Sequence, residues 1–123
     1  MNTTTLHGIP NCDTVKRARA WLTQHGVAHQ FRDFKKQGLP EALLDGWLLR
    51  VDWEVLLNRK GSTWRLLGED TRAATTSAAA ARMLMVAQPS LVKRPVVAWP
   101  DGRLTVGFDP DAWAQAAQAA QAK

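Results

Sequence analysis

The first 34 residues combine short apolar segments with one amphipathic stretch. Residues 3–7 favour a β-strand, and Gly8-Ile9-Pro10-Asn11 then interrupts regular structure. From position 13 the apolar residues recur at the helical spacing of three and four: Val15, Ala18 and Leu22. Gly26 ends that helix, and residues 27–34 favour a second strand. A strand, a helix and a strand in this order predict a parallel βαβ unit.

Residues 38–88 follow a helical pattern throughout. Pro40 stands where a first helix begins. The apolar stripe of that helix consists of Leu43, Leu44, Trp47, Leu48 and Val51. Residues 58–63 are polar and predict a loop, and Thr76 or Ser77 can cap the alanine-rich run that follows. The middle of the chain is therefore expected to form a helical lobe.

The pattern returns to strands after Pro95. Residues 96–99 are continuously apolar, which is typical of a strand covered on both faces. Pro100-Asp101-Gly102 predicts a tight hairpin. The alternating residues of the partner strand are Leu104, Val106 and Phe108. An Asp-Pro pair then starts a last helix. Its inner face consists of Trp113, Ala116, Ala117 and Ala120, with most of the docking resting on the tryptophan.

These elements predict an α/β fold of the order βαβ…ββα with an inserted helical lobe. We expect a single domain over residues 1–123, because 123 residues are too few for two ordinary domains. Its core is expected to comprise residues 1–37 and 89–123, and the helical insertion residues 38–88.

Composition excludes several classes of protein. One cysteine allows neither an internal disulfide nor a cysteine-based zinc site, so no metal is expected. No apolar run is long enough to span a membrane, and the start of the chain lacks a secretory pattern, so the cytoplasm is the expected location. The net charge of +5 is spread out, without the run of like charges of a nucleic-acid tail. The basic residues after position 31, Arg32, Lys35 and Lys36, are interpreted as solvated surface.

Cys12 is the candidate reactive group. It follows a strand and a polar loop and precedes the first helix, where free N–H groups and the helix dipole favour a thiolate. Lys16 adds positive charge one turn later, and Asp13 opposes it. Because position 15 holds valine, no second cysteine can resolve an oxidised Cys12, and a redox cycle needs an external thiol. A small buried hydrophobic residue is the alternative interpretation of Cys12.

Arg94 is the candidate anion ligand. Its planar guanidinium suits an oxyanion or a carboxylate. If Pro95 and Cys12 meet at one edge of the sheet, Arg94 can bind an anion beside the sulfur. Surface charge at a strand entrance is an equally good interpretation. Asn11 and Thr14 can bond the sulfur or cap the helix, and for Thr14 capping is favoured.

Four segments together resemble the arsenate reductase/Spx (ArsC) family, and most closely its YffB-like branch. They are Gly8-Ile9-Pro10-Asn11-Cys12-Asp13-Thr14-Val15-Lys16-Arg17-Ala18, Trp53-Glu54-Val55-Leu56-Leu57-Asn58, Gly61-Ser62-Thr63-Trp64-Arg65 and Lys93-Arg94-Pro95. The resemblance implies a thioredoxin-like fold with a helical insertion. It also implies that Cys12 is the nucleophile, that Pro95 is cis and faces it, and that Arg94 helps to hold an oxyanion.

The chain departs from arsenate reductases at three places. Gly8-Ile9 stand where those enzymes have a histidine–asparagine pair. Their second anion-binding arginine aligns with Lys60, or less closely with Arg59, and their third aligns near Gly107 and is missing. The resemblance therefore favours a glutathione-dependent thiol reductase over an enzyme dedicated to arsenate. Its site would use Cys12 as the catalytic group.

The resemblance also implies binding groups around that sulfur. The residues expected to bind the anion are Arg94, Lys60 and Asn11, and those expected to line the glutathione cleft are Lys93, Pro95 and Thr14. No tightly bound cofactor is expected. Glutathione is the expected reductant or co-substrate, glutaredoxin a possible partner, and the substrate is a small oxyanion or a disulfide.

Two alternatives stay open. The Spx branch uses this fold to bind RNA polymerase, although its Cys-x-x-Cys switch is absent here because of Val15. A family member without catalysis, kept as a scaffold, is the other alternative.

Overall fold

The computed structural model describes residues 3–121, with side chains described up to residue 118. The chain forms two compact units. The sheet unit comprises residues 1–37 and 94–123, and the helical unit comprises residues 38–93. Whether the whole chain behaves as one domain stays a prediction.

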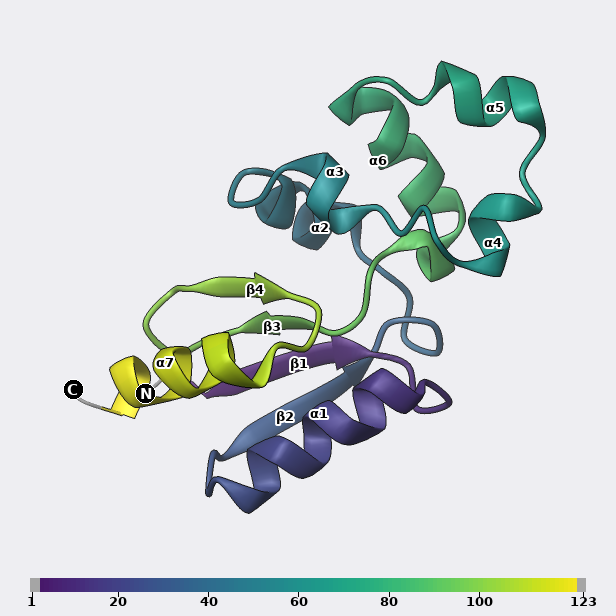
Figure 1. The fold of residues 1–123 in the computed structure, drawn as a ribbon. Helices are drawn as coiled ribbons and strands as arrows, with labels where there is room; N and C mark the ends of the chain where they lie inside the picture. The colour runs from purple at the N-terminus through teal and green to yellow at the C-terminus, as the bar shows by residue number, and fades with distance from the viewer. Residues whose placement is uncertain (1–2, 122–123) are drawn as a thin grey trace. The chain divides into compact units, whose positions relative to one another are not determined.

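The sheet unit contains four strands in the order β2-β1-β3-β4 (Figure 1). The strands are β1 (Thr4–Gly8), β2 (His29–Asp33), β3 (Val96–Ala98) and β4 (Leu104–Val106). The central strand β1 pairs in parallel with β2 and antiparallel with β3, which in turn pairs antiparallel with β4. The predicted α/β class and the predicted βαβ and ββα pairings are confirmed.

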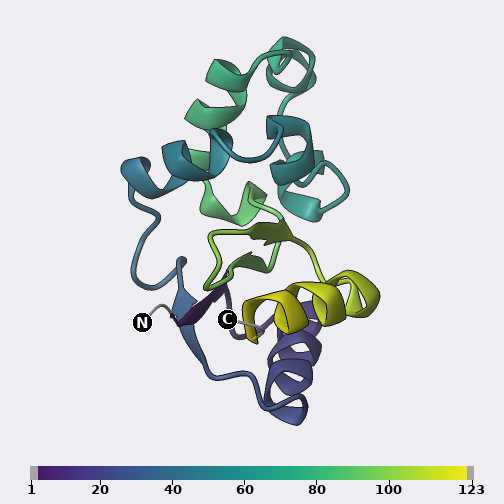
Figure 2. The same ribbon diagram turned by 90° about the vertical axis from the view of Figure 1, so that its left-hand side faces the viewer.

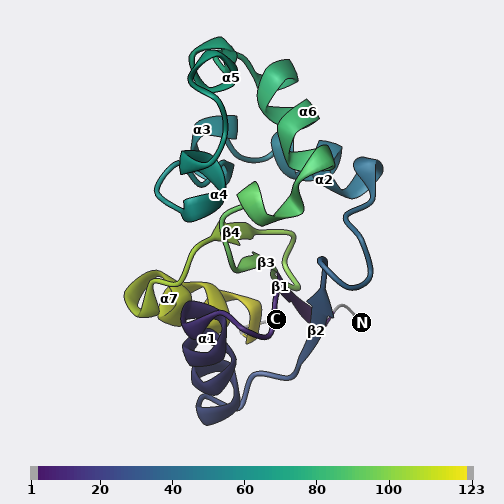
Figure 3. The ribbon, with the colours of Figure 1, turned by 90° about the vertical axis from the view of Figure 1, so that its right-hand side faces the viewer.

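Two helices of the sheet unit, α1 (Asp13–Gln24) and α7 (Pro110–Gln121), lie side by side on one face of the sheet (Figures 2 and 3). The core between them consists of Leu6, Val15, Ala18, Leu22, Val97, Trp99, Trp113, Ala116 and Ala117. The indole of Trp113 is 1% exposed and meets Trp21, Trp99 and Phe108 edge to face. Trp113 is therefore the docking residue of α7, as predicted, while Ala120 lies beyond the described side chains.

The turns of this unit follow from their residues. Gly26 and Gly102 adopt φ values of +67° and +91°, which only glycine reaches without strain. The Asp109 carboxylate accepts the N–H of Asp111 at 3.1 Å and so begins α7. The prediction that Phe108 belongs to the last strand is wrong, because Gly107, with φ +86°, ends the extended backbone after Val106.

The helical unit contains five α-helices and one 3-10 helix among the residues described. They are α2 (Glu41–Leu48), α3 (Trp53–Leu56), α4 (Ser62–Arg65), α5 (Glu69–Ala74), α6 (Ala78–Ala87) and η1 (Pro89–Leu91). The Ser77 hydroxyl accepts the N–H of Ala80 at 3.2 Å and caps α6, which decides between the two predicted caps. The prediction of a loop over residues 58–63 is wrong at its end, because α4 begins at Ser62.

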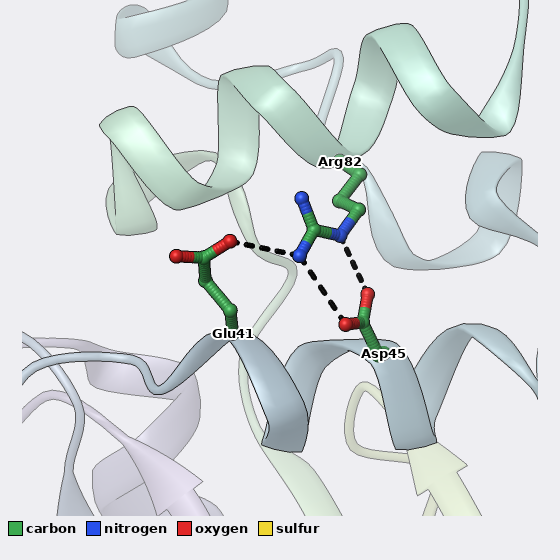
Figure 4. A network of polar contacts seen from close by, with 3 residues as sticks. All are labelled: Glu41, Asp45 and Arg82. Atoms are coloured by element: carbon green, nitrogen blue, oxygen red, sulfur yellow. Dashed lines mark hydrogen bonds and ion pairs between the residues drawn. The ribbon is translucent and has the colours of Figure 1, made fainter.

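An ion-pair network joins α2 to α6 (Figure 4). Arg82 on α6 contacts Asp45 at 2.5 Å and Glu41 at 2.8 Å, both on α2. Leu44 and Trp47 of α2 and Met85 of α6 are buried. The network therefore adds polar contacts, at partly exposed positions, between two helices whose apolar side chains are buried.

The helical unit runs past the predicted end of the insertion at residue 88. After η1 the chain returns to α3, where the Lys93 N–H donates to the Leu56 carbonyl at 2.8 Å and the Asn58 N–H donates to the Leu91 carbonyl at 2.7 Å. Leu57 and Val92 form an isolated β-bridge. These backbone bonds hold residues 89–93 within the helical unit.

Replacing Trp113 tests the core of the sheet unit. We expect Trp113→Ala to lower the free energy of unfolding by about 3–5 kcal/mol, because it removes a buried aromatic side chain and leaves a cavity. Trp113→Phe should cost less, because its ring stays apolar and the buried indole Nε1 has no hydrogen-bond acceptor among the described residues. Urea denaturation measures both. The exposed Gln115→Ala on the same helix should change stability by less than about 0.5 kcal/mol. A change of less than about 0.5 kcal/mol for Trp113→Ala would contradict the buried position of this side chain in the core.

His7 makes stability depend on pH. Its side chain is buried, and this burial, followed by the charge of Arg32, lowers the pKa of His7 from 6.5 to about 4. The folded state therefore disfavours protonation, and the unfolded chain binds the extra proton between pH 6.5 and 4. We expect His7 to lower the free energy of unfolding by up to about 3 kcal/mol as the pH falls through this window. Urea denaturation from pH 7.5 to 4 should show a smaller loss for His7→Gln than for the original chain. Equal losses would contradict the assignment.

Candidate functional site

The topology of the sheet brings Cys12 and Arg94 to one edge. Cys12 follows the carboxyl end of β1, and Arg94 precedes the amino end of β3. These two strands are antiparallel, with Leu6 opposite Val97 and His7 opposite Val96, so the two ends coincide. Cys12 and Arg94, which are 82 positions apart in the sequence, thus meet at one edge of the sheet. This meeting is what an anion site beside the sulfur requires.

A glycine allows β1 to end close against α1. A Cβ atom at Gly8 would lie 2.9 Å from Cγ2 of Val15, which is closer than real Cβ contacts. Val15 is fully buried on the first turn of α1. Any larger residue at position 8 would push on the same turn that follows Cys12. Gly8 therefore allows β1 to pass close to the first turn of α1.

Cys12 is the N-cap residue of α1. Its backbone is extended, with φ −117° and ψ 122°, and its carbonyl accepts the N–H of Lys16 at 2.9 Å. No side chain makes a conventional capping hydrogen bond at this helix. The thiol of Cys12 is the group that faces the free amides there, and it is partly exposed rather than sealed in the core.

The surroundings of the thiol favour its charged form. Partial burial raises the pKa of Cys12, but the N–H of Val15, the hydrogen bond and charge of Arg94, and the N–H of Thr14 lower it by more. The pKa of Cys12 is therefore below its ordinary value. Lys16, which was expected to contribute, is not among these causes. The backbone amides and Arg94 lower the pKa of Cys12 instead.

Arg94 lies within hydrogen-bonding reach of the sulfur, and the Arg94–Pro95 peptide is cis, as the resemblance implies. Pro95 is buried, and its carbonyl accepts the N–H of Gly107 at 2.8 Å. The backbone N–H of Gly107 therefore holds Pro95, the residue that follows Arg94. Because glycine has no side chain, Gly107 cannot supply the third anion-binding cation that arsenate reductases have near this position. The guanidinium of Arg94 and the amides of α1 supply the positive potential at the sulfur.

The structure separates the predicted roles of Asn11 and Thr14. Thr14 does not cap α1 through its hydroxyl, so that prediction is wrong; it acts on the sulfur through its backbone N–H. Asn11 is exposed in the loop before Cys12 and lines a cavity of about 320 Å³. The same cavity is lined by Asp33, Lys35 and Lys36. Sequence reasoning treated these basic residues as solvated surface, although the expected parallel pairing of β1 with β2 already placed them beside the Cys12 loop.

Lys60 and Lys93 belong to the helical unit, and their predicted roles at the site stay predictions. Arg59 lies 3.6 Å from Glu54 and stacks over the ring of Trp53, contacts that occupy it within its own unit. The exposed Lys60 follows a turn in which the Asn58 side-chain oxygen accepts its N–H at 3.1 Å. A Cβ at Gly61 would lie 2.9 Å from the Asn58 amide nitrogen, so a larger residue there would have to displace the Asn58 side chain.

The described residues contain no cluster of three or more histidine, cysteine, aspartate or glutamate side chains able to hold a metal ion. Within residues 3–121, no helix combines the length and apolar character that crossing a membrane requires.

The reaction of Cys12 with iodoacetamide across pH tests this electrostatic account. We expect the midpoint to lie below the ordinary cysteine value, and Arg94→Leu to raise it, because the change removes both a hydrogen bond and a positive charge. Arg94→Lys should fall between the two, since a lysine keeps the charge without the planar fork. Lys93→Gln removes a neighbouring charge and serves as the control. An unchanged midpoint in Arg94→Leu would show that the helix amides act alone.

Comparison with known proteins identifies relatives along nearly the whole chain. The model of the ArsC family matches residues 7–116. An uncharacterised protein of Haemophilus influenzae is 36% identical over 105 residues, which cover 85% of this chain and 90% of the relative.

Solved structures agree with this match. The YffB protein has a TM-score of 0.87 and 46% identity over 94% of this chain and 99% of its own. An arsenate reductase (ArsC) related protein from Brucella melitensis has a TM-score of 0.75 and 52% identity over 93% of both chains. These neighbours confirm the thioredoxin-like fold expected from the sequence. The chain belongs to the ArsC family.

Proposed function

We propose that this protein is a glutathione-dependent thiol oxidoreductase that works through Cys12 alone. The observation that carries the proposal is the contact between the Cys12 thiol and Arg94 at the amide-rich start of α1. A thiol with a lowered pKa is a nucleophile at neutral pH, and a guanidinium beside it can hold the carboxylate or oxyanion of an incoming substrate.

The reaction proceeds by two thiol–disulfide exchanges. In the first, the Cys12 thiolate attacks the glutathione sulfur of a mixed disulfide; the old S–S bond breaks, and the released thiolate takes up a proton. In the second, the thiolate of a free glutathione attacks the Cys12–glutathione disulfide, which releases oxidised glutathione and restores the Cys12 thiolate. In each cycle one free glutathione is oxidised: it leaves joined to the glutathione of the mixed disulfide as oxidised glutathione, and the other half of that disulfide leaves as a reduced thiol. No second cysteine is required, which agrees with the single cysteine of the chain.

The remaining predicted residues take binding roles in this proposal. Arg94 holds an anionic group beside the sulfur, and Lys60 keeps its proposed role as a second anion-binding residue. Asn11 and Thr14 flank the nucleophile in the chain, and Lys93 with Pro95 lines the path of the glutathione. Glutaredoxin is a second possible source of the reducing thiol. We place the reaction in the cytoplasm, where glutathione keeps thiols reduced.

Arsenate is the oxyanion to test beside disulfides. The relative from Brucella melitensis is named as related to arsenate reductase, and the Cys12–Arg94 pair suits an oxyanion. Two differences weigh against arsenate as the main substrate: Lys60 is a point charge that cannot bind an oxyanion in a bidentate manner, and Gly107 has no side chain. The thiol exchange needs neither of these cations.

Mass spectrometry and turnover test the proposal. The reduced protein, mixed with oxidised glutathione, should gain one glutathionyl group, lose it on addition of reduced glutathione, and reduce a glutathionylated peptide in repeated cycles. Cys12→Ser should abolish the adduct, and Arg94→Leu should slow its formation by about tenfold or more, because a hydrogen bond to a charged group contributes about 1.5–3 kcal/mol.

The controls separate this proposal from its rivals. Lys93→Gln, at a residue that the proposal also uses, should have a weaker effect than Arg94→Leu. Turnover of arsenate with glutaredoxin, but not of disulfides, would favour the arsenate reductase chemistry. Recovery of RNA polymerase in a pull-down, undiminished by Cys12→Ser, together with no adduct, would favour the Spx-like alternative.

A further inference from the structure

A cavity opens beside the loop that carries the nucleophile. It has a volume of about 320 Å³ and is lined by Ile9, Pro10, Asn11, Asp33, Lys35 and Lys36. The parallel register sets Gly8 opposite Asp33, so the segments that leave the carboxyl ends of β1 and β2 run next to each other. The Phe34 N–H donates to the Gly8 carbonyl at 3.2 Å and keeps them together. Crevices at the carboxyl ends of parallel strands are common ligand sites in α/β folds.

The cavity presents charges of both signs on a fixed turn. One carboxylate oxygen of Asp33 accepts the N–H of Lys35 at 3.0 Å and that of Lys36 at 3.1 Å. These bonds hold the carboxylate and the turn that carries both lysines. Ile9 and Pro10 supply apolar surface, and Asn11 adds an amide. The set matches a ligand with an ammonium group for Asp33 and a carboxylate for the lysines.

We propose that this cavity binds the amino-acid head of a peptidic thiol, meaning its α-ammonium and α-carboxylate groups, while the sulfur of that thiol exchanges with Cys12. The inference rests on the proposed function, and it names the feature of glutathione that the protein recognises. Asn11 lies in the cavity wall and directly precedes Cys12 in the chain, so their Cα atoms are about 3.8 Å apart. A ligand of tripeptide length, which spans roughly 10 Å when extended, has the reach to occupy both places.

The exchange balances without a further reactant. The Cys12 thiolate attacks one sulfur of a symmetrical disulfide; the S–S bond breaks, a Cys12–sulfur bond forms, and the other half leaves as a thiolate that takes up a proton. The cavity acts on the half that stays attached. Its contribution should therefore appear only with disulfides that carry the charged head.

Two disulfides and three variants test the inference. The rate of mixed-disulfide formation is measured by intact mass with oxidised glutathione and with bis(2-hydroxyethyl) disulfide, which has no charged groups. Lys35→Gln/Lys36→Gln should slow the reaction with oxidised glutathione roughly 3- to 20-fold, as expected for two exposed ion pairs, and leave the uncharged disulfide unaffected. Asp33→Asn keeps a side-chain oxygen that can accept the N–H groups of the turn. It should slow the reaction with oxidised glutathione and leave the reaction with the uncharged disulfide unchanged.

Lys16→Gln/Arg17→Gln is the matched control. It also removes two positive charges from exposed positions, on α1 near Cys12, and neither residue lines the cavity. If this control slows the reaction equally, the effect comes from positive charge in general and not from binding in the cavity. If the Lys35/Lys36 variant is not slowed, the inference is overturned. If the unmodified protein reacts with neither disulfide, the proposed function itself fails. Reaction with both at rates that no cavity variant changes would leave the function intact and refute only the cavity.

Discussion

The sulfur of Cys12 depends on positive potential that two separate parts of the chain supply. The amides of Val15 and Thr14 come from the first turn of its own helix, and the Arg94 guanidinium comes from the start of β3. Together they outweigh the cost of partial burial, which by itself would favour the neutral thiol. The local part follows from the position of Cys12 at a helix start, whereas the distant part exists only because the sheet is folded.

The sheet unit is built so that both parts stay in place. Gly8 lets β1 approach the first turn of α1 without a steric clash with Val15. The antiparallel pairing of β1 with β3 brings Arg94 to the same edge, and the hydrogen bond from Gly107 to the Pro95 carbonyl ties the hairpin to this strand. The Trp113 ring closes the core on the side of α1 and α7. These contacts pack α1 and β3 against the rest of the sheet unit, which places the first turn of α1 and Arg94 at the sulfur.

The helical unit consists of short helices. Most of its helices are too short to be stable alone, so packing and polar contacts must order them. Arg82 bridges two carboxylates of α2, and the strand-like return of residues 91–93 bonds to the backbone at Leu56 and Asn58. At Gly61 the Asn58 side chain lies close to the backbone, 2.9 Å from where a Cβ would stand.

The sequence by itself determined the order of the elements, the parallel βαβ unit, the docking role of Trp113 and the position of Cys12 at a helix start. These features follow from local rules: apolar spacing, glycine and proline at turns, and caps one to three residues away. Two local predictions were wrong. Phe108 lies outside β4 because Gly107 ends the extended backbone, and Thr14 does not cap α1 with its hydroxyl but acts on the sulfur through its backbone N–H.

Only the tertiary structure decided that Arg94 reaches the sulfur and that Lys35 and Lys36 share a cavity with Asn11. Charge and spacing along the chain left surface charge as good an interpretation of Arg94 as an anion site. The physical reason is the range of the forces involved. A guanidinium acts strongly on a thiol only within a few ångströms, and strand pairing, not sequence separation, determines which residues come that close.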